Sequence, residues 1–353
     1  MTPYILLFAF FALGAFFRRD LVAPDGLHWT PPQQPGLLLA AGAAVIALMI
    51  GLRFEVGADW FTYERIFAGA RSRDLAQTLL MNDPGYQFLN WLVYTAGLEM
   101  WGVNLLCGMI FAWGLYRFAR AQPEAWLAMV IAIPYLVTVV AMGYTRQAVA
   151  IGILMAGLAA VIQGGSVLRF ALYVGVAALF HKTAILVLPL VAFAGERNRL
   201  LNLLAGAASF YFLYDLLLAD SVEGFVRNYV GAKYDSQGAA IRVLMSLVPS
   251  LLFLSFQDRF GFHPHEKQIW RYFSFAAIGF LIALLVSPSS TAVDRMALYI
   301  FPLQLAVLSR VPIAFPGTGT QFAVILYSLA IQLVWLLFAV HAEYWLPYQL
   351  FPF

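Results

Sequence analysis

The first residues that could do chemistry form one polar segment at positions 53–63. It reads RFEVGADWFTY and contains an arginine, two carboxylates and a tyrosine, at Arg53, Glu55, Asp59 and Tyr63. Glu55 and Asp59 are four residues apart, so a helical turn would place both carboxylates on one face. A carboxylate can act as a general base on a hydroxyl, and an arginine can bind phosphate with two parallel hydrogen bonds. Anchoring at a membrane surface would explain the aromatic residues but not these charges.

Two further polar pairs stand at the start of apolar runs. Arg146 and Gln147 precede one run, where a cation lies against the positive end of a helix and needs an anion or a carboxylate to compensate it. His181 and Lys182 lie between two short apolar runs, and broken helices of this kind bind ions and anionic substrates in membrane proteins. All four residues are predicted to line a site.

A third segment has a good structural explanation. Asp83, followed by Pro84, is predicted to cap a helix over 85–98, because aspartate is favoured at the N-cap and proline at the first helical position. This interpretation leaves Tyr86 as the residue of the segment that could contact a ligand.

Two segments near the C-terminus complete the candidates. Asp294 and Arg295 are predicted to form an ion pair with each other at the start of a helix, with Asp294 as its cap and Tyr299 one turn further on. Arg295 could still face a cavity. Tyr348 belongs to an aromatic-rich tail that is typical of a membrane interface.

The elements that position these residues must lie in a membrane. Of the 353 residues, 62% are hydrophobic and only 11% are charged, whereas a soluble domain carries about 25% charged residues. This composition excludes a soluble enzyme. Because every backbone polar group must be satisfied within lipid, we predict an all-α, polytopic transmembrane bundle.

About twelve apolar segments are candidate spans, and no linker separates them, so residues 1–353 are predicted to form a single membrane domain. The spans are predicted at 4–17, 36–52, 101–117, 124–142, 147–162, 167–180, 184–195, 200–218, 241–257, 270–287, 296–310 and 321–340. We interpret 167–180 and 184–195 as two helices, because one continuous helix would place Lys182 near mid-bilayer at a cost of about 2.5–3.5 kcal/mol.

The charges between the spans predict the orientation. Twelve spans place both termini on one side, and the positive-inside rule makes the other side cytoplasmic. Residues 53–100 and 219–240 then form the two large outer loops, and the amphipathic stretch at 85–98 is predicted to lie in the interface or to re-enter. All the candidate residues fall on the outer side.

Several classes of site are absent from the sequence. A single cysteine, Cys107, excludes an intramolecular disulfide, and a net charge of +3 does not favour nucleic acid. The chain has no Gly-rich phosphate loop, GxSxG, HExxH or Asp-x-Asp motif. The run His263–Glu266 is interpreted as a solvated loop. No metal and no cofactor are predicted.

Four cations are predicted to lie at outer helix ends with carboxylates nearby: Arg53, Arg146, Lys182 and Arg295. Arginine forks match a diphosphate well, and a lipid-linked pyrophosphate presents two anionic groups at this depth. Asp59, or failing that Glu55, could deprotonate an attacking hydroxyl.

In three of these segments the chain resembles the EpsG/Wzy-type exopolysaccharide polymerases of bacterial inner membranes. Segment 53–63 resembles the family pattern R-x-x-x-G-x-D-[YW]-x-x-Y. Segment 145–150 resembles its R-Q-x-x-A helix start, and segment 180–184 its F-H-x-[ST]-A stretch. Residues 294–299 and 346–348 are weaker matches, and the family often has a threonine where this chain has Ala58.

The resemblance implies a GT-C-like glycosyltransferase whose periplasmic loops carry short interfacial helices. It would transfer a glycan from an undecaprenyl-diphosphate carrier to the non-reducing end of another lipid-linked repeat unit, at the periplasmic face of the inner membrane. The lipid-linked donor and acceptor, membrane lipid, a chain-length regulator and export proteins would be its partners.

The hypothesis assigns a role to each candidate. The predicted catalytic residues are Asp59, Glu55 and His181; the predicted diphosphate ligands are Arg53, Arg146, Arg295 and Lys182; the predicted substrate groove is Tyr63, Gln147, Tyr86, Asp294, Tyr299 and Tyr348.

Four alternatives remain open. Two are neighbouring transferases, one similar to an O-antigen ligase and one that binds a metal through Glu55 and Asp59. A third is a membrane acyltransferase with His181 as its base. The fourth is a flippase for lipid-linked glycan, which the almost wholly apolar spans at 124–142 and 200–218 disfavour.

Overall fold

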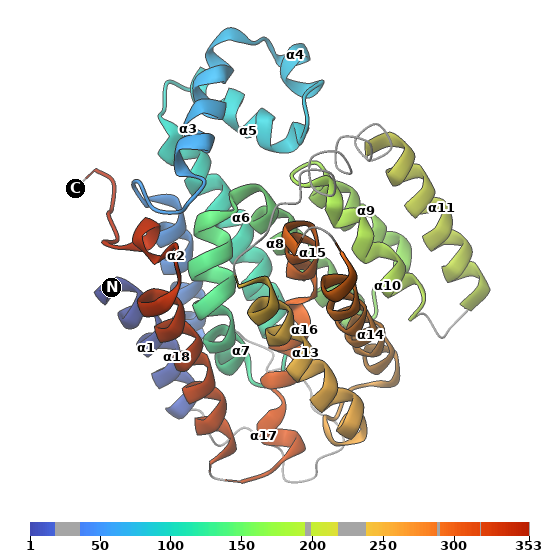
Figure 1. Cartoon of the computed structure of the whole chain (residues 1–353). Helices are drawn as coiled ribbons and strands as arrows, with labels where there is room; N and C mark the ends of the chain where they lie inside the picture. Colours follow the sequence, from blue (N-terminus) through green and yellow to red (C-terminus); the bar gives the residue numbers. More distant parts are fainter. Residues whose placement is uncertain (18–35, 195–198, 218–237, 288–289, 318, 353) are drawn as a thin grey trace.

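The chain is helical along its described length (Figure 1). A computed structural model describes residues 1–17, 36–194, 199–217, 238–287, 290–317 and 319–352. Within these ranges the one β-type contact is an isolated bridge between Arg53 and Leu350. The all-α prediction is confirmed.

Each predicted span overlaps an apolar helix, but most of these helices are too short to count as spans, so the number of about twelve stays a prediction. By length and composition the described residues contain five helices able to cross a membrane, or six if a bent pair counts as one span. The five are Met100–Arg120, Thr145–Ile162, Ala239–Arg259, Pro264–Val286 and Thr320–Phe338, and the bent pair is Ser290–Ile300 with Pro302–Ala314. The remaining predicted spans correspond to shorter apolar helices of 10–17 residues: Thr2–Phe17, Leu37–Gly51, Ala125–Ala141, Val167–Ala178, Lys182–Ala192 and Leu200–Asp215.

Helix α8 (Thr145–Ile162) lies at the centre of the bundle. In its apolar window 89% of the residues are buried, against 28% in α14 (Pro264–Val286) and 33% in α18 (Thr320–Phe338). The apolar side chains that α14 and α18 leave exposed suit lipid, since lipid tails are as apolar as the core. Helix α8 is therefore a core helix, and α14 and α18 belong to a lipid-facing shell.

Two glycines allow a close helix contact in the core. Helix α8 packs against α6 (Met100–Arg120), and a Cβ atom at Gly114 of α6 would overlap the carbonyl group of Gly152 in α8. Small residues at such crossings let helix backbones approach and gain van der Waals contact.

The region predicted as two short helices is confirmed as two. Helix α9 (Val167–Ala178) ends before His181, and the chain continues as a 3₁₀ segment (Lys182–Val187) and α10 (Leu188–Ala192) that pack back against α9. His181 and Lys182 therefore lie at the tip between two helices. Helix α11 (Arg199–Leu217) packs on α9 and α10.

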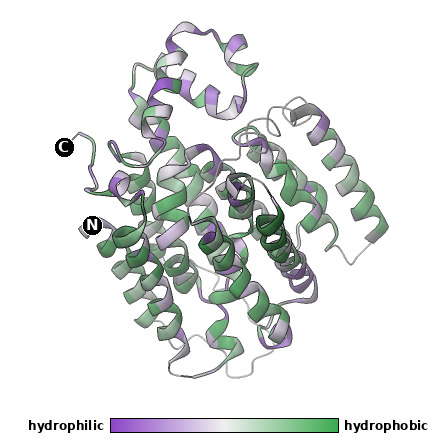
Figure 2. Ribbon diagram, viewed as in Figure 1, coloured by the Kyte–Doolittle hydropathy of each residue, from purple (hydrophilic) through white to green (hydrophobic). Residues whose placement is uncertain are grey.

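The segment after α2 (Leu37–Gly51) forms a small helical layer at one end of the bundle (Figure 1). It contains α3 (Trp60–Gly69), a 3₁₀ turn (Ala70–Ser72), α4 (Leu75–Leu79) and α5 (Pro84–Thr95). Figure 2 shows mixed polar and apolar residues there and mostly apolar residues on the bundle helices. The predicted helix at 85–98 corresponds to α5. Most of the predicted loop at 219–240 lies outside the described residues.

The other helices of the bundle come from both halves of the chain. Helix α7 (Ala125–Ala132) continues as a π-helix (Ile133–Ala141), and α13 (Ala239–Phe256) packs on α14, α15 (Ser290–Ala297) and α16 (Pro302–Leu308). Short turns at Gln257–Arg259, Leu298–Ile300 and Ala342–Trp345, and α17 (Val311–Ala314), connect these elements.

The Gly114–Gly152 contact predicts a large effect of one methyl group. We expect Gly114→Ala to lower the stability of the purified protein by about 1–3 kcal/mol, because the methyl group would force α6 away from α8. Thermal unfolding in detergent measures this. Gly279→Ala in α14 is the matched control, because no atom lies within 4 Å of its added Cβ and alanine is the better helix former. Equal melting temperatures for the two variants would contradict the prediction.

Candidate functional site

Arg53 is buried, with an exposed fraction of 1%. Its guanidinium donates hydrogen bonds to the carbonyl groups of Ile50 and Val56. It also donates to Asn104 Oδ1 at 3.3 Å and to Thr145 Oγ1 at 2.8 Å. These acceptors come from α2, the following loop, α6 and the first residue of α8. Arg53 thus joins these elements, and its hydrogen-bonding capacity is directed inward rather than toward a ligand.

The C-terminal tail holds the same loop from outside. Phe54 N–H donates to the Gln349 carbonyl at 3.0 Å, and Gly57 N–H donates to the Tyr344 carbonyl at 2.8 Å. Tyr348 donates its hydroxyl to the Met49 carbonyl at 2.8 Å. The tail is therefore packed against the segment that carries Asp59, and Tyr348 is engaged with α2.

Gly57 is required where it stands. Its φ is +106°, and a Cβ atom there would overlap the carbonyl group of Met142; both conditions favour glycine. Glu55 also has a positive φ, of 53°, and no helix spans 55–59. The prediction that a helical turn places Glu55 and Asp59 on one face is therefore wrong: Glu55 is exposed, whereas Asp59 is half-buried.

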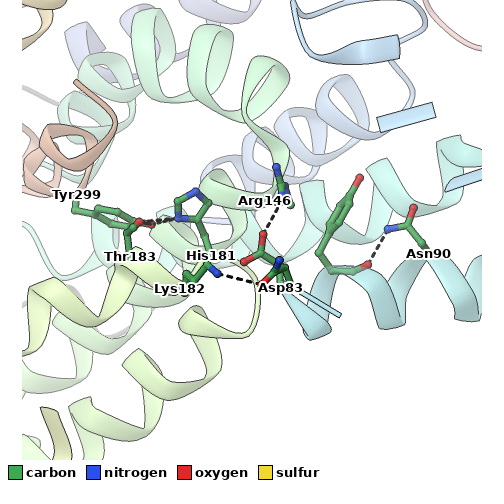
Figure 3. A network of polar contacts seen from close by, with 9 residues as sticks. Asp83, Asn90, Arg146, His181, Lys182, Thr183 and Tyr299 are labelled. Atoms are coloured by element: carbon green, nitrogen blue, oxygen red, sulfur yellow. Dashed lines mark hydrogen bonds and ion pairs between the residues drawn. The ribbon is translucent and has the colours of Figure 1, made fainter. Parts of the chain in front are cut away.

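Arg146 and Asp83 form an ion pair with an N–O distance of 2.6 Å (Figure 3). Asp83 does stand at the N-cap of α5 with Pro84 after it, but its side chain makes no capping hydrogen bond. The prediction of a purely capping role is wrong, because the carboxylate pairs with the guanidinium of Arg146. This pair provides the compensation that a cation at the start of α8 requires.

Asp59 shares this environment. Burial raises the pKa of Asp59, and the positive charges of Arg295 and Arg146 oppose that rise. The three side chains, which come from three separate parts of the chain, are therefore electrostatically coupled. A carboxylate with a raised pKa beside two cations has the properties that a general base needs.

His181 lies in a hydrogen-bonded triangle with two hydroxyls (Figure 3). Its Nδ1 atom is 2.7 Å from Thr183 Oγ1 and 2.9 Å from Tyr299 OH, and the two hydroxyl oxygens are 3.1 Å apart. Burial, followed by the charges of Arg146, Arg295 and Lys182, lowers the pKa of His181 to about 3. The imidazole is thus neutral at physiological pH.

Arg295 lies over an aromatic ring, with its Cζ 3.6 Å from the centroid of Tyr144. Its carbonyl group accepts a hydrogen bond from Gln147 Nε2 at 2.5 Å. Lys182 donates to Asn82 Oδ1 at 3.1 Å, next to Asp83 in the chain. Arg146, Gln147, Lys182 and Arg295 are thus brought to one end of the bundle.

Asp294 pairs with a residue that the sequence analysis did not single out. Arg242 Nε donates to Oδ1 of Asp294 at 2.5 Å and Arg242 Nη2 donates to Oδ2 at 2.7 Å, and both residues are buried. The predicted pair of Asp294 with Arg295 is wrong. A charged residue in the first turn of an apolar span was the signal for Arg242, since ionisable residues there usually have a specific partner.

Three polar atoms at the site are buried without a hydrogen-bond partner among the described residues: Arg146 Nε, Gln147 Oε1 and Tyr86 OH. Buried polar groups are normally paired. The ring of Tyr86 packs edge-on to Tyr63 at 5.6 Å, and Arg146 Cζ lies 6.0 Å from the Tyr63 ring. Polar atoms of a ligand could satisfy these groups.

The predicted solvated loop at 263–266 is also corrected. Glu266 is buried, pairs with Arg310 at 2.9 Å and accepts a hydrogen bond from Trp270 Nε1 at 3.2 Å. In the part of the chain that the structure describes, no three His, Cys, Asp or Glu side chains gather as a metal site would require.

The fold and composition define a polytopic helical membrane protein with cations and carboxylates gathered at one end. The sequence model of the EpsG family matches residues 37–350, and the chain belongs to this family. No curated protein and no solved structure is significantly similar to it. The resemblance predicted from the motifs is confirmed.

The buried Arg242–Asp294 pair predicts strong coupling. Arg242→Gln alone should destabilise the protein by about 3–5 kcal/mol, because it leaves a buried carboxylate without its counter-charge. Adding Asp294→Asn should recover most of that loss. Chemical unfolding of the two single variants and the double variant in detergent gives the coupling energy, and purely additive effects would argue against the pair.

The low pKa of His181 predicts a specific acid sensitivity. Below about pH 6.5 the unfolded chain binds a proton at this histidine and the folded protein does not, so acidification favours unfolding. We expect His181→Asn to reduce the loss of stability between pH 7 and pH 5, by up to about 1.4 kcal/mol per pH unit. Asp59 and Asp83 are present in both the wild type and His181→Asn. The difference between the stability curves of these two proteins therefore isolates the contribution of His181. Parallel curves would refute the assignment.

Proposed function

We propose that this protein is a polysaccharide repeat-unit polymerase. It transfers a glycan from an undecaprenyl-diphosphate carrier to the non-reducing end of another lipid-linked repeat unit. Membership of the EpsG family supports exopolysaccharide polymerisation. The observation that carries the proposal for the site is the gathering of cations at one end of a membrane bundle. There Arg146 pairs with Asp83 at 2.6 Å and keeps its Nε atom buried without a hydrogen-bond partner among the described residues.

Asp59 is the proposed base. It takes the proton from the acceptor hydroxyl while the hydroxyl oxygen bonds to the anomeric carbon of the donor. The bond from that carbon to the diphosphate breaks, and undecaprenyl diphosphate leaves with the bonding electrons. Glu55 is the weaker candidate for this role, because its side chain is exposed whereas Asp59 is half-buried.

Arg146, Arg295 and Lys182 are the proposed diphosphate ligands. The side chain of Arg146 is 33% exposed, so one face can meet a ligand while the other holds Asp83. An incoming diphosphate would compete with Asp83 for this guanidinium. His181, which is neutral at pH 7, would donate its one N–H to an oxygen of the leaving phosphate. Charge neutralisation and positioning would supply most of the rate.

Tyr63, Tyr86, Gln147 and Tyr299 are proposed to border the sugars, near the unpaired polar atoms of Gln147 and Tyr86. We assign supporting roles to Arg53, Asp294 and Tyr348, whose hydrogen bonds are made within the protein: each positions an element that carries a proposed ligand or base. Arg53 donates to Thr145, Asp294 accepts from Arg242, and Tyr348 donates to the Met49 carbonyl.

The proposal extends to the setting of the reaction. The chain forms one GT-C-like membrane domain with about twelve spans in the bacterial inner membrane, and the site faces the periplasm. The lipid-linked donor and acceptor are its substrates, and a chain-length regulator and export proteins are its proposed partners. No metal or other cofactor is assigned a role in this mechanism.

The role assignments predict loss of polymer. Asp59→Asn keeps the shape of the base but removes its charge, and Arg146→Lys removes the planar fork that binds two oxygens. We expect each to reduce polymer formation by about 10²-fold or more, as measured by glycan length on gels from membranes that contain equal amounts of protein.

Arg71→Lys is the matched control, since Arg71 is exposed in the same helical layer and should sustain normal polymer length. Full-length polymer from both site variants would refute the roles of Asp59 and Arg146. Movement of labelled lipid-linked glycan across vesicles, with no growth in glycan length, would identify a flippase instead.

A further inference from the structure

An apolar groove runs between α2 and α6, away from the candidate site. Its volume is about 300 Å³. It is lined by Ala40, Ala43, Ala44 and Ala47 of α2, and by Met109, Ala112, Trp113 and Tyr116 of α6. Met109 is 45% exposed and Trp113 is 44% exposed, so the groove opens to the outside of the bundle, where lipid lies.

The groove follows from the side chains on the two helices. The alanines of α2 are too short to fill the space beside α6, while Met109, Trp113 and Tyr116 stand along the opposite wall. At Gly108 the helices come close, because a Cβ atom there would lie 2.8 Å from the Ala47 carbonyl oxygen. The space therefore opens between Gly108 and the C-terminal end of α6.

Two arginines border that end of the groove. The Cζ atom of Arg117 lies 6.0 Å from the ring centroid of Trp113, and that of Arg120 lies 5.4 Å from the ring centroid of Tyr116. Both rings line the groove. No carboxylate of the described residues lies within ion-pair distance of either arginine. A helix C-terminus favours cations, but it does not supply the full counter-charge that two arginines require.

The groove is separate from the candidate site. Asn104, which contacts Arg53, is thirteen residues before Arg117 on the same helix, and a rise of 1.5 Å per residue separates them by about 20 Å. Arg117 and Arg120 thus lie toward the opposite end of the bundle from Arg146 and Lys182, two of the proposed diphosphate ligands. Tryptophan, tyrosine and arginine are the residues expected at the level of lipid headgroups.

We propose that this groove binds an anionic phospholipid, with an acyl chain against the alanines of α2 and the phosphate on Arg117 and Arg120. The apolar lining suits the chain, and arginine pairs suit the phosphate. Basic pockets between helices bind anionic headgroups in the same way. The net negative charge of the lipid complements the two arginines, whereas a zwitterionic lipid with the same chains does not.

Native mass spectrometry of the purified full-length protein in detergent tests the proposal. The probes are dioleoyl-phosphatidylglycerol and dioleoyl-phosphatidylcholine, which share their acyl chains. We expect the wild type to retain phosphatidylglycerol preferentially. Arg117→Gln and Arg120→Gln should each weaken that retention by about fivefold, and Ala43→Phe should abolish it by filling the groove.

The controls separate this site from others. Arg259→Gln removes a cation that contacts Phe256 at the end of α13 and Phe315 after α17, away from α6. Val248→Phe enlarges an exposed side chain of α13. Both should bind lipid as the wild type does. Unchanged melting temperatures show that the groove variants are folded, and if Ala43→Phe fails to fold, the two arginine variants decide the question.

Three results would overturn the proposal. Equal retention of the two lipids would show that charge is not recognised. Loss of phosphatidylglycerol in Arg146→Gln, but not in the arginine pair of α6, would place the lipid at the candidate site. A dimer of the wild type that Ala43→Phe dissociates would identify a second copy of the chain as the occupant.

Discussion

The hydrogen bonds of one buried arginine hold together the parts that form the site. Arg53 binds carbonyl, amide and hydroxyl oxygens from the end of α2, the following loop, α6 and the first residue of α8. A buried guanidinium must have its donors satisfied, because an unpaired buried charge is costly. Its acceptors are thereby kept in place, and Arg146 follows Thr145 directly. The position of the proposed diphosphate ligand thus depends on a residue that is itself turned away from solvent.

The charges at the site are arranged in pairs with an excess of cations. Arg146 is matched by Asp83, and Arg242 by Asp294. Asp59 is the third carboxylate and lies in the field of Arg295 and Arg146, while Lys182 lies near Asp83. Four cations thus face three carboxylates, so the local charge is positive before any ligand binds. Because Arg242 neutralises Asp294, the positive charge of Arg295 is not cancelled by its neighbour in the chain. Such a site attracts anions, and the pKa of His181 is lowered first by burial and then by the same positive charges.

The bundle positions these groups through helix ends. The first turn of α8, the last turn of α9 and helix α15 lie toward the same end of the bundle. This is the end that carries the layer formed by α3 to α5 (Figure 1). The central α8 is packed by neighbours that approach through glycines, so its first turn is fixed in relation to α6. The C-terminal tail closes the arrangement by bonding to the loop that precedes Asp59.

The sequence was enough to predict the positions of the apolar helices and the family. It also predicted that Arg146, His181 and Arg295 lie at the same end of the bundle. Apolar composition over some twenty residues is a local property, and alternating spans bring every second loop to the same side. Ion-pair partners could not be predicted in this way. Asp83 and Arg146 are 63 residues apart, and Arg242 and Asp294 are 52 apart, so their pairing depends on how helices pack. The inward direction of Arg53 was equally invisible, because a guanidinium suits a phosphate and a cluster of carbonyl groups alike. Only the tertiary structure decided between these, since it alone brings the acceptors of Arg53 within reach.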